Sequence, residues 1–201
     1  IFPAVKAVGE ELADRIFYLT AKTITATVAK ETFALLQKNG YRAKTIQITA
    51  KEKLCPCDEM ECNPVTCPYA KGHFDRVNDA VFDLLHRCEM IERDDILSQA
   101  DRYTVCPFEL CLDTASWCDN IICDYNYVFD PNVYLKRFFQ EGIKGDYIFL
   151  IDEAHNMVER SRQMYSAQIY KEDFLTVKRI MKLHSRSIEK ALEKCNKILL
   201  G

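Results

Sequence analysis

Apolar residues along the first fifty positions alternate between the spacing of helices and that of strands. They recur at three- and four-residue steps before residue 14, and a short run rich in β-branched and aromatic residues comes next, at 15–20. A second helical pattern, which Thr23 can cap, leads to another apolar run at 45–48. Strands that alternate with helices indicate a parallel α/β sheet.

This alternation stops near residue 51, where cysteines, prolines and acidic residues replace the apolar pattern. A helical pattern returns at 74–85, and a polar stretch extends from there as far as Arg102. Two later apolar runs, at 120–123 and 147–151, are typical of buried parallel strands. We therefore expect one sheet that is interrupted by an insertion.

The last part of the chain is predicted to be helical. From Lys171 onward, apolar residues recur at three- and four-residue steps as far as Leu199, which predicts one long amphipathic helix. This helix would begin a helical module and not complete one.

The composition is that of a folded globular protein. The chain has 201 residues, of which 48% are apolar and 28% are charged, and its net charge is −3. Any DNA contact therefore requires a local basic patch. No apolar stretch approaches the roughly 20 residues that span a bilayer, and the first nine residues lack the features of a signal peptide. We expect an intracellular, cytoplasmic protein with no membrane contact.

Cysteine usage points to a metal or cluster site. The chain has ten cysteines, and nine of them fall between Cys55 and Cys123. Disulfide scaffolds are typical of short secreted chains with a thin core, whereas this chain has an apolar core and no export signal. Ligation of a metal or an iron–sulfur cluster is therefore the better interpretation.

One motif carries hydrolytic chemistry. An apolar run leads directly into Asp152, Glu153 and His155. In P-loop ATPases an Asp at the C-terminal end of a strand orients Mg²⁺, and the next Glu would polarise the attacking water. The sequence Asp152-Glu153-Ala154-His155 resembles the DEAH box of helicases, in which the His couples the nucleotide site to the nucleic-acid site. The alternative is a strand that merely ends in solvated acidic residues.

A phosphate-binding loop is absent, because none of the six glycines belongs to a Gly-x-x-x-x-Gly-Lys-Ser/Thr sequence. The start of the chain resembles the segment just downstream of the Walker A lysine in DEAH-type helicases, which implies a fragment without its P-loop. Thr20, Lys22 and Thr23 would then form motif Ia, whose hydroxyls, backbone N–H groups and lysine suit a DNA phosphate. Such turns also often serve only to cap a helix.

The second motif that indicates a function is a set of four cysteines, each close to a proline or to the end of a predicted strand: Cys55, Cys62, Cys67 and Cys106. Four thiolates can hold [4Fe–4S] or Zn²⁺, but zinc modules usually present Cys-x-x-Cys pairs, which this chain lacks. The irregular three-plus-one spacing favours a cluster, and Cys57 could replace Cys55 as its first ligand. Three further cysteines repeat part of this spacing, but we expect them to be buried as small apolar residues: Cys111, Cys118 and Cys123.

These cysteines resemble the iron–sulfur insertion of XPD/DinG-family DNA helicases, and an aromatic run at 125–131 strengthens the resemblance. The resemblance covers nearly the whole chain. It implies an α/β fold, with parts of a RecA-like motor domain at 1–50 and 107–160. A mainly helical [4Fe–4S] domain would occupy 51–106, and a helical Arch domain would start at 161–201.

The resemblance also implies an ATP-dependent DNA helicase of 5′-to-3′ polarity, active in DNA repair as a monomer on single-stranded and forked DNA. ATP and Mg²⁺ would be its cofactors beside the cluster, with Mg²⁺ on Asp152. The fragment alone should not hydrolyse ATP. Basic and aromatic residues near the cluster are what a single-strand groove uses, although a solvated helix face is an equal alternative. The expected nucleic-acid contacts beyond motif Ia are Tyr69, Lys71, Arg76, Tyr125 and Tyr127.

Two other functions would account for part of the sequence. A non-catalytic zinc-binding interaction module would make the DEAH letters accidental, and it would be colourless where a [4Fe–4S] protein is brown. An iron–sulfur electron carrier would require a second cofactor site, but the sequence contains no dinucleotide-binding fingerprint.

Overall fold

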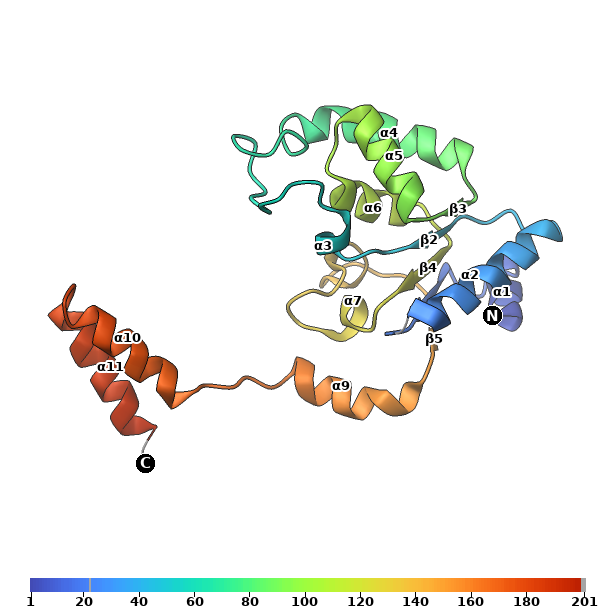
Figure 1. Ribbon diagram of the computed structural model, residues 1–201. Helices are drawn as coiled ribbons and strands as arrows, with labels where there is room; N and C mark the ends of the chain where they lie inside the picture. Colours follow the sequence, from blue (N-terminus) through green and yellow to red (C-terminus); the bar gives the residue numbers. More distant parts are fainter. Residues whose placement is uncertain (22, 200–201) are drawn as a thin grey trace. The chain divides into compact units, whose positions relative to one another are not determined.

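The computed structural model describes residues 1–21 and 23–199 of the chain (Figure 1). Two compact units make up the chain, residues 1–164 and 165–201, and each is described by itself. None of the helices in the described ranges is long and apolar enough to cross a membrane.

The first unit is built on a five-stranded sheet in which every strand pair is parallel, in the order β3-β2-β4-β1-β5. This confirms the predicted α/β fold with a parallel sheet. In register, Ile16 of β1 lies between Asn120 of β4 and Ile148 of β5. The strands are β1 (Arg15–Leu19), β2 (Thr45–Gln47), β3 (Met90–Ile91), β4 (Asn120–Cys123) and β5 (Tyr147–Ile151).

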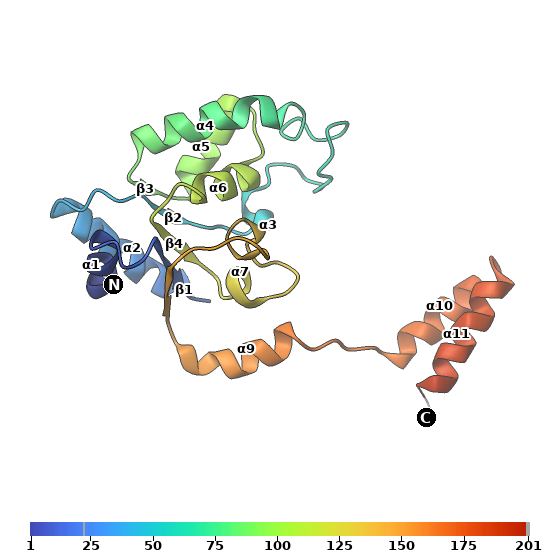
Figure 2. The ribbon, with the colours of Figure 1, turned by 180° about the vertical axis from the view of Figure 1, so that it is seen from behind.

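Alternate residues of the strands face two layers of helices, because successive side chains of a strand point to opposite faces. On one face, Ile122 packs with Phe33 of α2 (Thr23–Lys38), beside α1 (Phe2–Gly9). On the other face, Phe17 and Ile121 belong to the larger core. Figures 1 and 2 show α1 and α2 on one side of the sheet. On the other side lie α4 (His73–Arg87), α5 (Arg93–Tyr103) and α6 (Pro107–Ala115).

Aromatic rings from β1, β5 and the connection between β4 and β5 form a cluster in which Phe17 and Phe138 are buried and Phe149 is 39% exposed. Phe17 stacks on Phe149 with ring centroids 5.5 Å apart, and its ring meets those of Phe138 and Tyr147 edge-on at 5.3 Å. Two short helices in the connection from β4 to β5 bring Phe138 into this cluster. They are α7 (Asn126–Phe129) and α8 (Lys136–Phe139).

The predicted insertion contributes more to the fold than its sequence indicates. It begins with α3 (Lys51–Leu54), a loop at 55–72 and α4. The stretch up to Arg102, predicted to be merely polar, contains both β3 and α5, and β3 pairs with β2 at the edge of the sheet. α5 forms because the side chains of Glu92 and Asp95 make a reciprocal capping box.

Buried polar contacts hold α4 and α5 together. The fully buried Gln99 donates to the carbonyl of Ala80 at 2.8 Å and to the carboxylate of Asp83 at 3.0 Å. Its amide oxygen accepts a hydrogen bond from Arg87 at 2.8 Å. The loop at 55–72 is therefore attached to a firmly packed pair of helices.

The second unit is a helical hairpin, in which α10 (Lys171–Met181) packs against α11 (Arg186–Ile198). The prediction of one long helix from Lys171 is therefore wrong. Ser185 adopts an extended backbone and its hydroxyl accepts from the N–H of Ile188, so the chain starts a new helix there. Lys178 of α10 and Glu193 of α11 approach to 3.7 Å.

Candidate functional site

The DEAH segment leaves the sheet at the C-terminal edge of β5. The N–H of Asp152 still donates to the carbonyl of Leu19 in β1 at 3.0 Å, so Asp152 continues the strand ladder by one residue. Glu153 then takes a left-handed backbone with φ 50°, which is uncommon for a residue other than glycine. This turn leads into η1 (Ala154–Asn156) and α9 (Met157–Met164).

The carboxylate of Asp152 has the character of a cation ligand. Its Oδ2 atom is buried and makes no hydrogen bond with any residue in the described part of the chain. A buried carboxylate oxygen without a partner is costly unless a cation or a donor reaches it. Oxygen ligands are what Mg²⁺ prefers. The side chain of Asp152 is therefore of the kind that a Mg²⁺ site uses, and the Mg²⁺ site itself stays a prediction.

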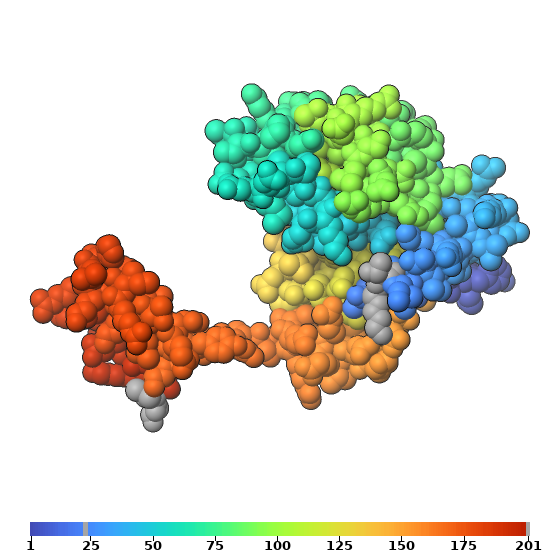
Figure 3. All heavy atoms as spheres, in the orientation of Figure 1, coloured from blue at the N-terminus to red at the C-terminus, as the bar shows by residue number. Residues whose placement is uncertain are grey.

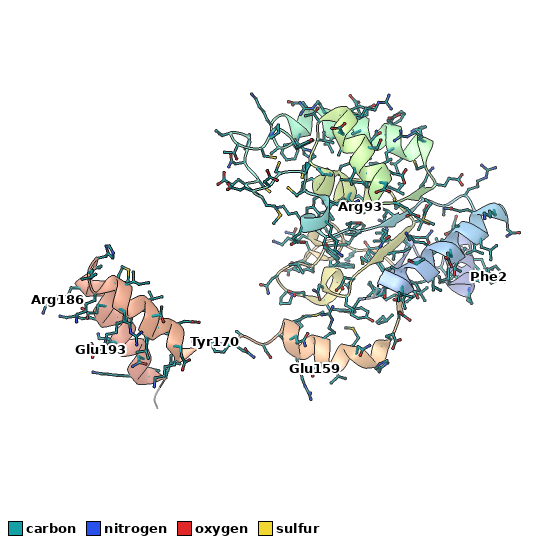
Figure 4. All side chains as sticks on the ribbon, in the orientation of Figure 1. Phe2, Arg93, Glu159, Tyr170, Arg186 and Glu193 are labelled. Atoms are coloured by element: carbon teal, nitrogen blue, oxygen red, sulfur yellow. The ribbon has the colours of Figure 1, made fainter. Side chains whose placement is uncertain are left out.

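Glu153 and His155 lie together beside the turn. Nε2 of His155 is 3.3 Å from Oε2 of Glu153. Both residues line a cavity of about 260 Å³. Glu159 of α9, labelled in Figure 4, lies on its wall. The other lining residues are Thr20, Ala21, Tyr125, Asn156 and Arg160. The three predicted catalytic residues are thus brought to one edge of the sheet together with Thr20.

A second, larger cavity of about 460 Å³ lies at the C-terminal ends of β1, β2 and β4. Thr20 and Tyr127, both predicted nucleic-acid contacts, line it together with Lys53. Two other cations on its wall have partners within the protein. Lys30 pairs with Glu92 at 2.8 Å, and Arg93, labelled in Figure 4, donates to the carbonyl of Lys53 at 3.0 and 3.2 Å. Arg93 is one of the basic residues near the predicted cluster that suit a single-strand groove, whereas no sequence pattern pointed to Lys30.

The predicted motif Ia residues are Thr20, Lys22 and Thr23, and the structure describes them to different extents. Thr20 is buried, with 6% of its surface exposed, and its N–H donates to the carbonyl of Cys123 at 3.0 Å. Lys22 lies outside the described residues. Thr23 begins α2, and its side chain also lies outside the described part of the structure.

The two predicted tyrosines of the aromatic run have different surroundings. Tyr127 is half-buried, and burial, together with nearby negative groups, raises its pKa to about 12. Tyr125 is only 1% exposed, and its hydroxyl donates to the backbone carbonyl of Asp152. The prediction that Tyr125 contacts nucleic acid therefore needs correction, because its ring has no free face on which a base could stack.

Five thiols lie around the loop at 55–72, which is part of the surface of the first unit (Figure 3). Partial burial and the neighbouring thiols of Cys67 and Cys55 raise the pKa of Cys57 to about 11. Cys62 hydrogen-bonds with Lys51, which raises the pKa of that lysine. The remaining thiol, Cys106, stands at the N-cap of α6, and burial raises its pKa.

These five thiols include the four predicted ligands, but their arrangement is not that of a metal-binding group in the described residues. All are free of disulfides, and four of the five come from a single loop. Across residues 1–21 and 23–199, however, no group of three His, Cys, Asp or Glu side chains is arranged to hold a metal ion. The structure leaves both Cys55 and Cys57 as possible first ligands.

The remaining cysteines near the sheet are buried, as the sequence predicts. Cys111, Cys118 and Cys123 are at most 3% exposed. Burial raises the pKa of all three thiols, that of Cys111 to about 12. They therefore behave as small apolar core residues.

The predicted basic and aromatic surface is only partly available. Lys71 is exposed and Tyr69 is half-buried. The half-buried guanidinium of Arg76 donates to the carbonyls of Lys71, Tyr103 and Thr104 at 2.7, 2.8 and 2.6 Å. Arg76 is thus engaged in holding the end of the loop against the end of α5, which the sequence did not reveal.

Fold and site together define part of a RecA-like domain with an acidic DEAH turn at the edge of a parallel sheet. The model of the DEAD_2 family matches residues 24–174, which is three quarters of the chain. The chain belongs to this family. The predicted resemblance to XPD-family iron–sulfur helicases is confirmed.

Three curated proteins illustrate the relationship. The chain is 32% identical over 108 residues to the general transcription and DNA repair factor IIH helicase subunit XPD/RAD3 of Saccharomyces cerevisiae, covering 54% of the chain and 13% of that protein. It is 28% identical over 76 residues to the Fanconi anemia group J protein homolog of Gallus gallus, covering 38% and 6%. It is 21% identical over 133 residues to the regulator of telomere elongation helicase 1 of Rattus norvegicus, covering 61% and 10%. The chain therefore spans 6 to 13% of the length of these relatives.

Proposed function

We propose that the complete protein is an ATP-dependent DNA helicase and that this chain supplies part of its first motor domain. The observation that carries the proposal is the DEAH turn, where a buried oxygen of Asp152 has no partner among the described residues and Glu153 lines a cavity. Two of the relatives are named as helicases, one of them as a subunit of a DNA repair factor.

In this proposal each acidic residue has one task. Asp152 would hold Mg²⁺, which would neutralise charge that develops on the transferred phosphoryl group. Glu153 orients the attacking water and accepts its proton. His155 lies beside Glu153, with its Nε2 atom 3.3 Å from Oε2 of that carboxylate. The phosphate-binding loop is not part of this sequence.

Replacement of Glu153 by Gln in the full-length protein tests the motor. ATP hydrolysis should be abolished while nucleotide binding persists, because the amide fills the same space but cannot accept a proton. Glu141→Gln, an equal change at an exposed position in the connection to β5, should leave turnover unchanged. Near-normal turnover by Glu153→Gln would remove this residue from the mechanism.

The proposal extends to a [4Fe–4S] cluster held by Cys55, Cys62, Cys67 and Cys106. Support comes from the free thiols on one loop and at the start of α6. The cluster would have a structural role, because a surface loop of 18 residues with few apolar side chains cannot close a core of its own.

Iron and sulfide assays test the cluster. Anaerobically purified protein should contain about four of each per chain, as expected for this cluster type. Cys62→Ser should bleach the protein, whereas Cys118→Ser, at a buried core position, should not. A comparison of Cys55→Ser with Cys57→Ser identifies the first ligand. Stoichiometric zinc without iron would favour the zinc-binding interaction module instead.

The DNA strand is proposed to run along the larger cavity at the edge of the sheet. Thr20, Lys53 and Tyr127 line it, and the last two offer a cation and an aromatic ring. The hydroxyl of Thr20 is hydrogen-bonded to that of Thr25. Exposed Lys71 and half-buried Tyr69 would extend the contact surface onto the insertion. The resemblance supports 5′-to-3′ movement on single-stranded and forked DNA by an intracellular monomer.

A further inference from the structure

Tyr125 connects the end of one strand to the DEAH turn across an intervening strand. It lies two residues beyond β4, and in the sheet β1 lies between β4 and β5. Its side chain is nevertheless buried, and its hydroxyl donates to the carbonyl of Asp152 beyond β5. The phenol therefore reaches past the end of β1.

This hydrogen bond belongs to a series that joins all three strand ends. The N–H of Thr20 donates to the carbonyl of Cys123 at 3.0 Å, and the N–H of Asp152 donates to the carbonyl of Leu19 at 3.0 Å. The hydroxyl of Tyr125 adds the return connection from the β4 side to Asp152. It is the one member of the series that a side chain provides, so it is the one that a substitution can remove.

A second contact attaches the same segment to the far end of the DEAH turn. The carboxylate of Asp124 lies 3.4 Å from the guanidinium of Arg160 in α9. Asp124 and Tyr125 therefore hold the residues on both sides of Glu153: the Asp152 carbonyl before it and α9 after it.

The position of Glu153 depends on this attachment. The carbonyl that Tyr125 binds belongs to the peptide bond between Asp152 and Glu153. Glu153 itself has a left-handed backbone, so a rotation of that peptide would redirect its side chain. A small displacement of a catalytic group can reduce a rate by about a hundredfold.

We propose that Tyr125 is a positioning residue for Glu153, and that it sets the rate of hydrolysis without contacting the nucleotide. This inference rests on the proposed ATPase function. A hydroxyl that merely satisfies a buried carbonyl would affect stability and leave the balance between kcat and KM unchanged.

The test is Tyr125→Phe in the full-length protein, which removes one oxygen atom and keeps the ring that packs in the core. We expect kcat for DNA-stimulated ATP hydrolysis to fall at least tenfold, with KM for ATP and nucleotide affinity changed less than twofold. Tyr134→Phe, in the same connection between β4 and β5, should leave kcat unchanged, because no side-chain hydrogen bond of Tyr134 is found among the described residues.

Asp124→Asn supplies a second variant if Tyr125→Phe does not fold, and it should lower kcat in the same direction by a smaller factor. In either variant, unchanged nucleotide affinity shows that the site is intact. A kcat within twofold of wild type in a folded Tyr125→Phe protein, or a loss of kcat and of nucleotide affinity together, would overturn the inference. Wild-type protein without Glu153-dependent hydrolysis would instead contradict the proposed function.

Discussion

Replacement of Arg76 by Met distinguishes a structural arginine from one that binds DNA. The substitution keeps most of the length and the apolar stem of the side chain but removes its donors. Three hydrogen bonds are lost, to the carbonyls of Lys71, Tyr103 and Thr104 at 2.7, 2.8 and 2.6 Å. These bonds join the end of the cysteine loop to the residues just before Cys106.

The size of the effect can be estimated from these contacts. A hydrogen bond to a charged group is worth about 1.5 to 3 kcal/mol when it is protected from water. Arg76 as a residue is half-buried, but its bonds to Lys71 and Thr104 are exposed to solvent, so we use at most about 1 kcal/mol for each bond, which is up to about 3 kcal/mol in all. Since 1.4 kcal/mol corresponds to a factor of ten, local opening should become up to roughly a hundredfold more frequent.

Native-state hydrogen exchange measured by mass spectrometry reports this opening directly. The N–H of Val105, which donates to the carbonyl of Ala100 at 3.0 Å, should lose protection in Arg76→Met. Iron content should fall as well. Arg162→Met, which removes only an exposed ion pair with Glu159, is the control and should change neither. Unchanged exchange near Val105 combined with weaker DNA binding would refute this reasoning and return Arg76 to the DNA surface.

Three other substitutions probe the DNA surface, the core and the acid stability of the first unit. Lys71→Glu should weaken binding of a single-stranded oligonucleotide in fluorescence anisotropy and lower the slope of log affinity against log salt concentration by about 1. Lys144→Glu, at another exposed position, should change this affinity little, and equal effects of the two substitutions would indicate only a change in net charge. Leu84→Ala, at a fully buried position of α4, should lower the free energy of unfolding in urea by about 2 to 5 kcal/mol. Leu12→Ala, at an exposed position, should lower it by less than about 0.5 kcal/mol, and similar losses in the two variants would contradict the observed packing. The hydrogen bond from Gln99, and then the charge of Arg102, lower the pKa of Asp83, so its contribution to stability is present above about pH 4 and is lost as pH falls below it. The acid limb of a circular-dichroism titration should accordingly be shallower in Asp83→Asn than in wild type, and identical limbs would exclude this contribution.

The parts of the fold that the sequence predicts are those with strong local patterns. The strands at 15–19, 120–123 and 147–151 are short apolar runs, and the first two are buried between the helical layers, which requires that composition. The third, β5, lies at the edge of the sheet and has no buried residue, so the prediction that it is a buried strand is wrong. β3 has only two residues and no such pattern, so only its pairing with β2 identifies it. α5 is mostly polar, although its capping box was a usable signal.

In the candidate site, too, the residues that the sequence predicts are those that belong to a local pattern. Asp152, Glu153 and His155 are neighbours in sequence, and a strand end brings such residues to one edge of the sheet. The contacts of Tyr125 and Arg76 depend on elements that are 27 and 28 residues away in sequence. Residue type alone suggests a surface role for an arginine or a tyrosine, and only tertiary packing shows where its polar atoms are used.

Strand displacement by the full-length protein tests the central claim most directly. A labelled duplex with a single-stranded 5′ tail should be separated in the presence of ATP and Mg²⁺, and a duplex with only a 3′ tail should not. Glu153→Gln should bind the tailed duplex without separating it. The absence of ATP-dependent displacement on either duplex, by iron-containing protein that binds DNA, would contradict the helicase assignment.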